Sequence, residues 1–196
     1  MDNNTFTKAV SRLQEVLAYN RRQPSPRPPF GSKDEVLGRY QPIFAREHLP
    51  DLTVSEFRSF LVHKNNKHWR GLHRQSRRIT SDMETLRNSL DFLLYGEGDI
   101  APRFTRSVRS VKGMGHGIAS ALLLVRYPDR YGVWNGASEK GMKTLKVWPA
   151  FRRGSSEGEK YVAINKVLLS LVDETGMDLW TLDAVWWDLK SYQKLF

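Results

Sequence analysis

The feature that most constrains the fold is a pair of glycines, Gly113 and Gly115, between two stretches whose apolar residues recur at helical spacing. Glycine adopts positive φ freely, so a G-x-G arrangement favours a tight turn that another backbone can approach closely. An apolar run from Ile118 to Val125 follows the turn and is too short to span a bilayer. The sequence therefore predicts helices over 102–110 and 118–126 joined by a short hairpin.

The rest of the chain shows the same periodicity, with apolar residues three and four positions apart and no alternation typical of paired strands. Polar capping residues stand where these patterns begin. The sequence therefore predicts an all-α fold, a helical bundle. The other expected helices are 5–20, a stretch over 33–48 interrupted at Pro42, one capped by Thr53 or Ser55, 68–78, one capped by Ser81 and ended by Gly96, one starting at Asn135 or Ser138, 159–175, and one capped by Asp178.

Proline content divides the chain. Residues 23–31 (QPSPRPPFG) hold four prolines, which predicts an extended linker or a wrap along the surface. The expected organisation is an N-terminal helix over 1–22, this linker, and a helical domain over 32–196. No cysteine is present, so disulfides and thiolate metal sites are excluded.

Charge favours a polyanionic partner. The chain carries 31 Lys and Arg against 21 Asp and Glu, a formal net charge of +10. The alternative is a basic surface that is only solvated. The N-terminus lacks the layout of a signal peptide, so we expect no membrane partner and a cytoplasmic protein, nucleoid-associated when bound. The histidines His63, His68 and His73 step by five, which does not place them on one helix face. We expect them at the surface or as caps, with no metal site.

Two basic series stand out because neither contains an acid. From Arg58 to Arg78 there are seven Lys or Arg residues, and the second series leads directly into the G-x-G turn. We expect such side chains to bind phosphates beside backbone amides. The alternative is a solvated face whose charges pair with Asp82, Asp91 or Glu97. The candidates are Lys67, Arg70 and Arg74 in the first series and Arg103, Arg106, Arg109 and Lys112 in the second.

The start of the helix after the turn is a candidate phosphate site, since its first N–H groups have no intrahelical partner. The residues concerned are Gly113, Gly115, His116 and Gly117. Asn66 and Trp69 are candidates for contact with a base, because Asn pairs with base edges and Trp stacks on exposed bases. The alternative is a helix junction with Trp69 in the core.

The stretch from Val108 to about Leu145 resembles the core of the helix-hairpin-helix DNA glycosylase superfamily. The hairpin pattern is V-K-G-M-G-H-G-I-A over 111–119, and the second landmark is Y-G-V-W-N-G over 131–136. The resemblance implies a glycosylase-like fold that grips double-stranded DNA, with a monovalent cation on the hairpin carbonyls as the one cofactor to consider. It also implies a base pocket lined by Trp134 and Asn135.

The chain departs from that family at its two reactive positions. Asn135 stands where the family has a catalytic aspartate, and Gly117 stands where some members have a nucleophilic lysine. A neutral amide is no general base, and glycine removes the Schiff-base route. Asp129 and Glu139 lie a few residues away and are weak candidates, with Asn135, for a catalytic role, although capping explains both acids more simply.

The leading hypothesis is therefore a DNA-binding protein that reads an extruded or modified base without cleaving it. One alternative is an active DNA glycosylase or lyase with a displaced carboxylate, and another is a basic protein-interaction module. The segments 65–72, 131–135 and 179–187 also resemble a family of bacterial proteins without a settled activity. A looser resemblance is to modules that accompany restriction or phage-defence systems, and the expected setting is DNA repair or phage defence.

The last helix is expected to close the core, since Trp180, Trp186 and Trp187 make it apolar on most of its circumference. Asp183 lies within this apolar context, so it needs an Arg or a backbone partner. We interpret it as a structural ion pair or cap.

Overall fold

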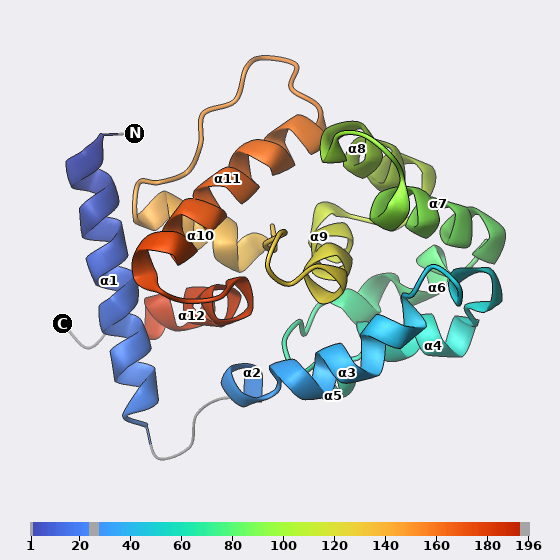
Figure 1. Ribbon diagram of the computed structural model, residues 1–196, viewed down its shortest axis with the longest axis horizontal. Coiled ribbons are helices and arrows are strands. Elements are labelled where there is room, and N and C mark those ends of the chain that lie inside the picture. Colours follow the sequence, from blue (N-terminus) through green and yellow to red (C-terminus); the bar gives the residue numbers. More distant parts are fainter. Residues whose placement is uncertain (1, 24–27, 193–196) are drawn as a thin grey trace.

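The computed structural model describes residues 2–23 and 28–192, and every regular element in these two ranges is a helix (Figure 1). The all-α prediction is confirmed. Among the described residues, none of the helices combines the length and the apolar character that crossing a bilayer demands. The α-helices are α1 (Asn3–Arg21), α2 (Pro28–Gly31), α3 (Lys33–Ile43), α4 (Val54–Leu61), α5 (His63–Asn66), α6 (Ser76–Ile79), α7 (Met83–Tyr95), α8 (Ile100–Ser110), α9 (His116–Arg126), α10 (Gly136–Thr144), α11 (Glu157–Thr175) and α12 (Leu179–Tyr192), with 3-10 turns η1 (Leu49–Asp51) and η2 (Leu72–Gln75).

The apolar helix α9 lies at the centre of the molecule, and all of its residues from Ile118 to Val125 are buried. A helix that is apolar on every side needs neighbours around its whole circumference. Figure 1 shows α9 with α10, α11 and α12 on one side and α7 and α8 on the other, while α3 also contacts it. This central position fixes the turn that precedes α9 against the rest of the fold.

Close helix crossings occur where glycine leaves room for a neighbour. A Cβ at Gly158 of α11 would lie 1.7 Å from the carbonyl oxygen of Ala101 in α8. The Gly158 N–H donates to the Thr105 hydroxyl at 2.9 Å across the same crossing. A Cβ at Gly141 of α10 would lie 2.3 Å from the indole of Trp186 in α12. These two crossings hold α8 to α11 and α10 to α12.

The N-terminal helix α1 packs on α11 and α12, and Leu13 and Val16 belong to the same hydrophobic cluster as the rest of the fold. The extended conformation expected over 23–31 is wrong at its end, because residues 28–31 form the helical turn α2, which contacts α12. Residues 24–27 lie outside the described residues.

Several helix boundaries follow the predicted caps. Thr53 makes a capping box with Glu56, Asn135 caps α10, and Asp178 accepts from the Thr181 N–H at 2.7 Å. The cap of α7 is Asp82 rather than Ser81. The helix after the turn begins at His116, two residues before the expected position, so the turn is tighter than the sequence indicated.

Candidate nucleic-acid interface and pocket

The turn between α8 and α9 packs against α6 on one side and is exposed on the other. Gly113 has φ of +90°, a conformation that favours glycine, and a Cβ there would lie 3.2 Å from side-chain atoms of Arg78 and Ile79. Met114 is buried. Gly115 is exposed, and a Cβ built on it would meet nothing within 4 Å. The turn therefore rests on α6 while Gly115 faces outward.

The first N–H groups of α9 lack intramolecular acceptors. Gly115 is the N-cap residue and supplies no side-chain cap. Within 2–23 and 28–192, no hydrogen bond takes up the N–H groups of Gly115, His116 or Gly117, whereas those of Ile118 and Ala119 bond to the Gly115 carbonyl. Such amides carry the positive end of the helix dipole and suit an anion.

The hollow beside these amides is lined by a positively charged side chain, that of Arg78. It has a volume of about 400 Å³ and is lined by Arg78, Gln75, Gly113, Gly115 and Gly117 among others. Arg78 is exposed and comes from α6, far from the turn in the sequence. An anion at the start of α9 would therefore meet backbone N–H groups and a guanidinium together.

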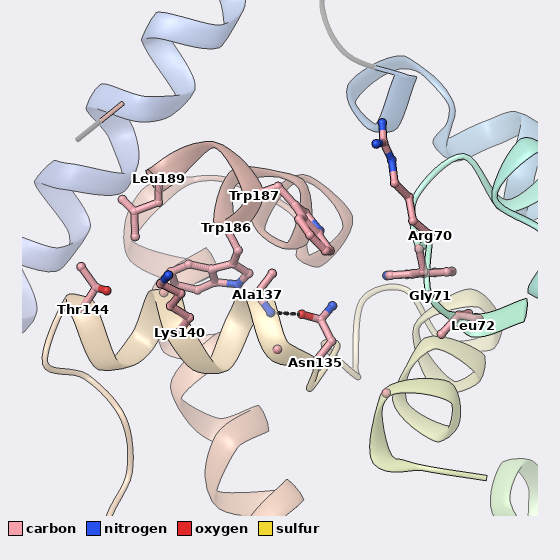
Figure 2. Close-up of a pocket in the computed structure, with 14 residues that line it drawn as sticks. Arg70, Gly71, Leu72, Asn135, Ala137, Lys140, Thr144, Trp186, Trp187 and Leu189 are labelled. Atoms are coloured by element: carbon pink, nitrogen blue, oxygen red, sulfur yellow. Dashed lines mark hydrogen bonds between the residues drawn. The ribbon is translucent and has the colours of Figure 1, made fainter. Parts of the chain in front are cut away.

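A second, more apolar pocket adjoins this hollow, because Gly71, Leu72 and Gly117 line both. Its volume is about 400 Å³. Figure 2 shows one wall built from α10 and α12 and the facing wall from residues 70–72. Apolar contacts come mainly from indole and aliphatic side chains, which are Trp69, Leu72, Ala137, Trp186, Trp187 and Leu189. The polar side chains include Arg70, Asn135, Lys140 and Thr144.

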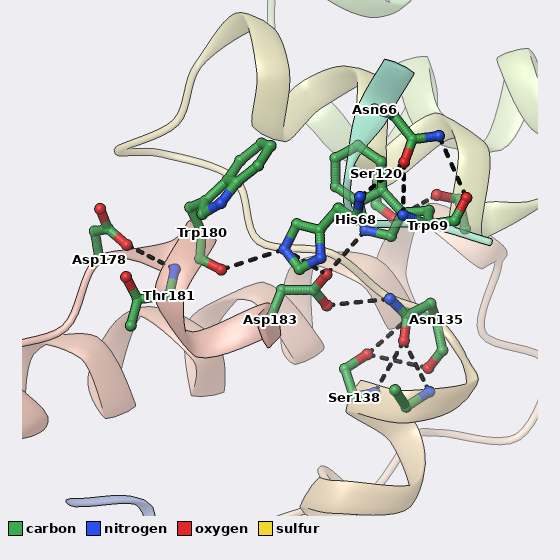
Figure 3. Close-up of polar contacts among 12 residues, drawn as sticks. Asn66, His68, Trp69, Ser120, Asn135, Ser138, Asp178, Trp180, Thr181 and Asp183 are labelled. Carbon is green, nitrogen blue, oxygen red and sulfur yellow. Dashed lines mark hydrogen bonds and ion pairs between the residues drawn. The ribbon is translucent and has the colours of Figure 1, made fainter. Parts of the chain in front are cut away.

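A buried polar network centred on Asp183 of α12 connects the two walls (Figure 3). Asp183 is 2% exposed and accepts hydrogen bonds from the Trp69 indole at 2.9 Å and from the Asn135 amide at 3.0 Å. Nε2 of His68 lies 3.3 Å from the same carboxylate. The partners expected for Asp183, an Arg or the backbone, are thus wrong.

Burial is the largest influence on the pKa values of Asp183 and His68 in this network. It raises the pKa of Asp183, although the neighbouring His68, Trp69 and Asn135 act in the opposite direction. Burial also lowers the pKa of His68, which the sequence placed at the surface or at a cap. That expectation is wrong for His68, because it is 3% exposed and stacks on Trp69.

Of the four residues predicted to line a base pocket, two line the aromatic pocket and two do not. Asn135 and Trp69 line the aromatic pocket, but Trp69 is only 3% exposed and packs against Phe60 and Trp180, as the alternative of a core position predicted. Asn66 does not, because it is fully buried and its amide bonds to the backbone of Phe60 and of residues 68–69. Trp134 is also buried, between Phe104 and His116, and its backbone N–H is held by Ser120 of α9.

The residues of the second basic series do not lie on one shared surface. Arg103 is 8% exposed and donates to the Gly96 carbonyl at 2.7 Å, where it caps the end of α7. Its assignment to a phosphate surface is therefore wrong. Arg106 and Arg109 are exposed, but they line a different hollow beside α11, and Arg106 lies over the Phe92 ring. Lys112 is exposed in the turn itself.

The residues of the first basic series lie in different places and do not form one phosphate-binding surface. Lys67 pairs with Glu35 at 3.7 Å. Arg70 is exposed at the rim of the aromatic pocket, and Arg74 is exposed on η2. Arg78 lines the hollow at the turn, and no pattern in the sequence distinguishes it from the other basic residues, because only the fold brings α6 to the turn.

The acidic candidates lie away from the pocket. Asp129 is exposed in the turn after α9, and Glu139 forms an ion pair with Lys143 that lowers the pKa of Glu139. Neither residue lines the aromatic pocket. Asn135 caps α10 and accepts from the N–H groups of Ala137 and Ser138.

His116 opens α9, and its ring stacks on Trp134 with centroids 4.1 Å apart. Burial lowers the pKa of His116, although Glu157 and Glu139 raise it. The charged form of His116 is therefore less favoured than that of an exposed histidine. In the part of the chain that the structure describes, no three His, Asp or Glu side chains gather as metal ligands.

Comparisons of the chain with models of known protein families, with curated proteins and with solved structures gave no significant match.

Proposed function

We propose that this protein binds DNA through a helix-hairpin-helix of the glycosylase-like type formed by α8, the turn and α9. The N–H groups at the start of α9, with Arg78, hold a backbone phosphate, and the aromatic pocket receives an extruded or modified base. Double-stranded DNA is the partner, because extrusion from a duplex delivers one base to a pocket beside the backbone.

The observation that carries this proposal is the continuity of the two hollows through Gly71, Leu72 and Gly117. One hollow offers amide and guanidinium donors, and the next offers indole rings. A nucleotide has the same two parts, an anionic phosphate and a planar aromatic base. The net charge of +10 adds a general attraction to nucleic acid.

The proposal assigns no bond-breaking step. The alternative, an active glycosylase or lyase with a displaced carboxylate, draws no support from Asp129 or Glu139, since neither lines the pocket. Asp183 is near the pocket, but its oxygens already accept from Trp69 and Asn135. These contacts fit a protein that binds a base without cleaving DNA better than they fit a glycosylase.

Gly115→Asp tests the phosphate site. The position tolerates a side chain, since a Cβ there meets nothing within 4 Å. Asp is a preferred N-cap, so its carboxylate will bond to the free N–H groups of α9 and occupy the place of a phosphate. We expect the dissociation constant for a short duplex to rise at least about tenfold, since a hydrogen bond to a charged group is worth about 1.5–3 kcal/mol. Fluorescence anisotropy at fixed salt measures it.

Gly38→Asp is the matched control. Gly38 is exposed on α3, and a Cβ there also meets nothing within 4 Å, so the variant makes the same change of charge away from the turn. Thermal melting should leave Gly115→Asp as stable as the original chain or more stable, because its helix gains a cap. Equal DNA affinity for the original chain and Gly115→Asp would rule out the phosphate site.

A further inference from the structure

The Asn135 side chain has a fixed orientation at the wall of the aromatic pocket. Its oxygen accepts from the N–H groups of Ala137 at 2.8 Å and Ser138 at 3.0 Å, which uses both of its lone pairs. Its nitrogen donates one hydrogen to Asp183 at 3.0 Å. The second hydrogen on that nitrogen is left for a ligand.

The reverse orientation of this amide is unfavourable at both ends. It would bring the NH₂ group against two backbone N–H donors and the oxygen against the carboxylate of Asp183. Asp183 is itself held by the Trp69 indole, which can only donate. Asp183 is therefore a positioning residue that keeps the Asn135 nitrogen available as a donor.

The other polar side chains of the pocket are also donors. Lys140 and Arg70 carry no acceptor, and the indole rings offer only N–H groups. Thr144 can accept, but Figure 2 shows it beyond Lys140, at the far end from Asn135. Among the described residues that line the pocket, none is an Asp or Glu.

We infer that the pocket selects a planar heterocycle that presents hydrogen-bond acceptors, such as the carbonyl oxygen of a keto base, over one that presents an exocyclic amino group. This inference rests on the proposed function, because it assumes that the pocket receives a base. Stacking on Trp187, the exposed indole of the pocket, tolerates every base, so discrimination depends on Asn135. An amino group facing Asn135 would leave two donors opposed.

The test uses four duplexes that differ at one position, which carries hypoxanthine, adenine, uracil or cytosine opposite a tetrahydrofuran abasic analogue. None of these bases has a pairing partner, so differences in extrusion cost are small. We expect hypoxanthine to bind about tenfold more tightly than adenine, and uracil about tenfold more tightly than cytosine, the effect of one hydrogen bond gained or lost. A fully paired duplex measures binding without a base in the pocket.

Asn135→Ser replaces the amide donor by a shorter hydroxyl, which can donate or accept and so does not discriminate, and it keeps a preferred N-cap. Both affinity ratios should fall to within about twofold, whereas binding of the fully paired duplex should not change. Lys143→Ala is the control, because Lys143 is exposed on α10 and does not line the pocket. Its ratios should equal those of the original chain.

The outcomes separate the two claims. Equal affinity for keto and amino bases, or a preference for amino bases, overturns the inference while DNA binding stands. Absence of binding to all duplexes, the paired one included, overturns the proposed function and the inference with it. The comparison of the four bases uses the unaltered chain, so it remains decisive even where Asn135→Ser is poorly folded.

Discussion

Asn135 combines a local contact with a contact that only the fold creates. Its cap of α10 spans three residues, and the sequence predicted it because Asn favours N-cap positions. Its bond to Asp183 spans 48 residues, and nothing in either segment indicates the other. The same reason explains why the partners of Asp183 and the burial of His68 and Trp134 were predicted wrongly. Long-range packing decides whether such residues face a pocket or the core.

His116 gives the site a pH dependence. Burial lowers the pKa of His116 below that of a free imidazole, so the ring gains its positive charge at a lower pH than an exposed histidine does. A positive charge on the first residue of α9 favours a bound phosphate. We therefore expect the affinity for DNA to rise severalfold as the pH falls through the lowered pKa of His116.

His116→Phe tests this expectation, because phenylalanine can keep the stack on Trp134 but cannot titrate. Anisotropy titrations at each pH compare the variant with the original chain. The nearby charged groups Glu157, Glu139 and Lys160 are present in both proteins, so they cancel from the difference. A rise of equal size in His116→Phe would assign the effect to other groups.

At the level of elements, apolar periodicity predicted most of the helices, because each buries one face at 3.6-residue spacing. Boundaries were less predictable where tertiary contacts decide them. The sequence predicted a helix that begins at residue 159 and so excludes Gly158, yet Gly158 lies in the first turn of α11 against Ala101 of α8. The local hydrophobic pattern does not indicate a close approach of two helices, and only the glycine itself suggests one.

Gly158→Ala should destabilise the fold strongly. The added Cβ would lie 1.7 Å from a backbone oxygen of α8, which cannot move without separating the helices. Overpacking typically costs about 1–3 kcal/mol, and we expect the upper end of that range or more in the free energy of unfolding. Urea denaturation measures it.

Gly38→Ala provides the comparison at an open position. Gly38 is an exposed residue within α3 with no atom within 4 Å of the added Cβ. Replacing a helical glycine by alanine there should stabilise the chain by about 0.5–1 kcal/mol. If Gly158→Ala proves as stable as Gly38→Ala, the close crossing of α8 and α11 is wrong.

Across the whole molecule, the fold separates basic residues that the sequence presents as two continuous series. Arg78 reaches the turn, Arg106 and Arg109 lie beside α11, and Arg103 is buried. The sequence could predict that the molecule attracts polyanions, since net charge needs no coordinates. It could not predict which cations share a surface with the turn.

DNA affinity should fall steeply with salt, because phosphate contacts release counterions. If only about three phosphates are neutralised, the affinity falls more than about tenfold between about 50 and 200 mM salt. Arg78→Ala should reduce the slope of log affinity against log salt by about one, the change expected from one lost phosphate contact.

Arg109→Ala removes the same charge from the surface beside α11 and should change the slope less. Titrations over a series of salt concentrations give all three slopes. If the affinity for DNA does not change with salt concentration, the remaining alternative, a basic protein-interaction module, is favoured. Equal effects of the two variants would argue that the turn has no special part in binding.

The contact between Asn135 and Asp183 also limits which sequences this fold can carry. The two side chains are 3.0 Å apart and Asp183 is buried, so acids at both positions would have to share a proton. A relative with aspartate at position 135 should therefore carry a neutral residue at position 183. Positions 135 and 183 should covary as a mutually exclusive pair, with one negative charge between them.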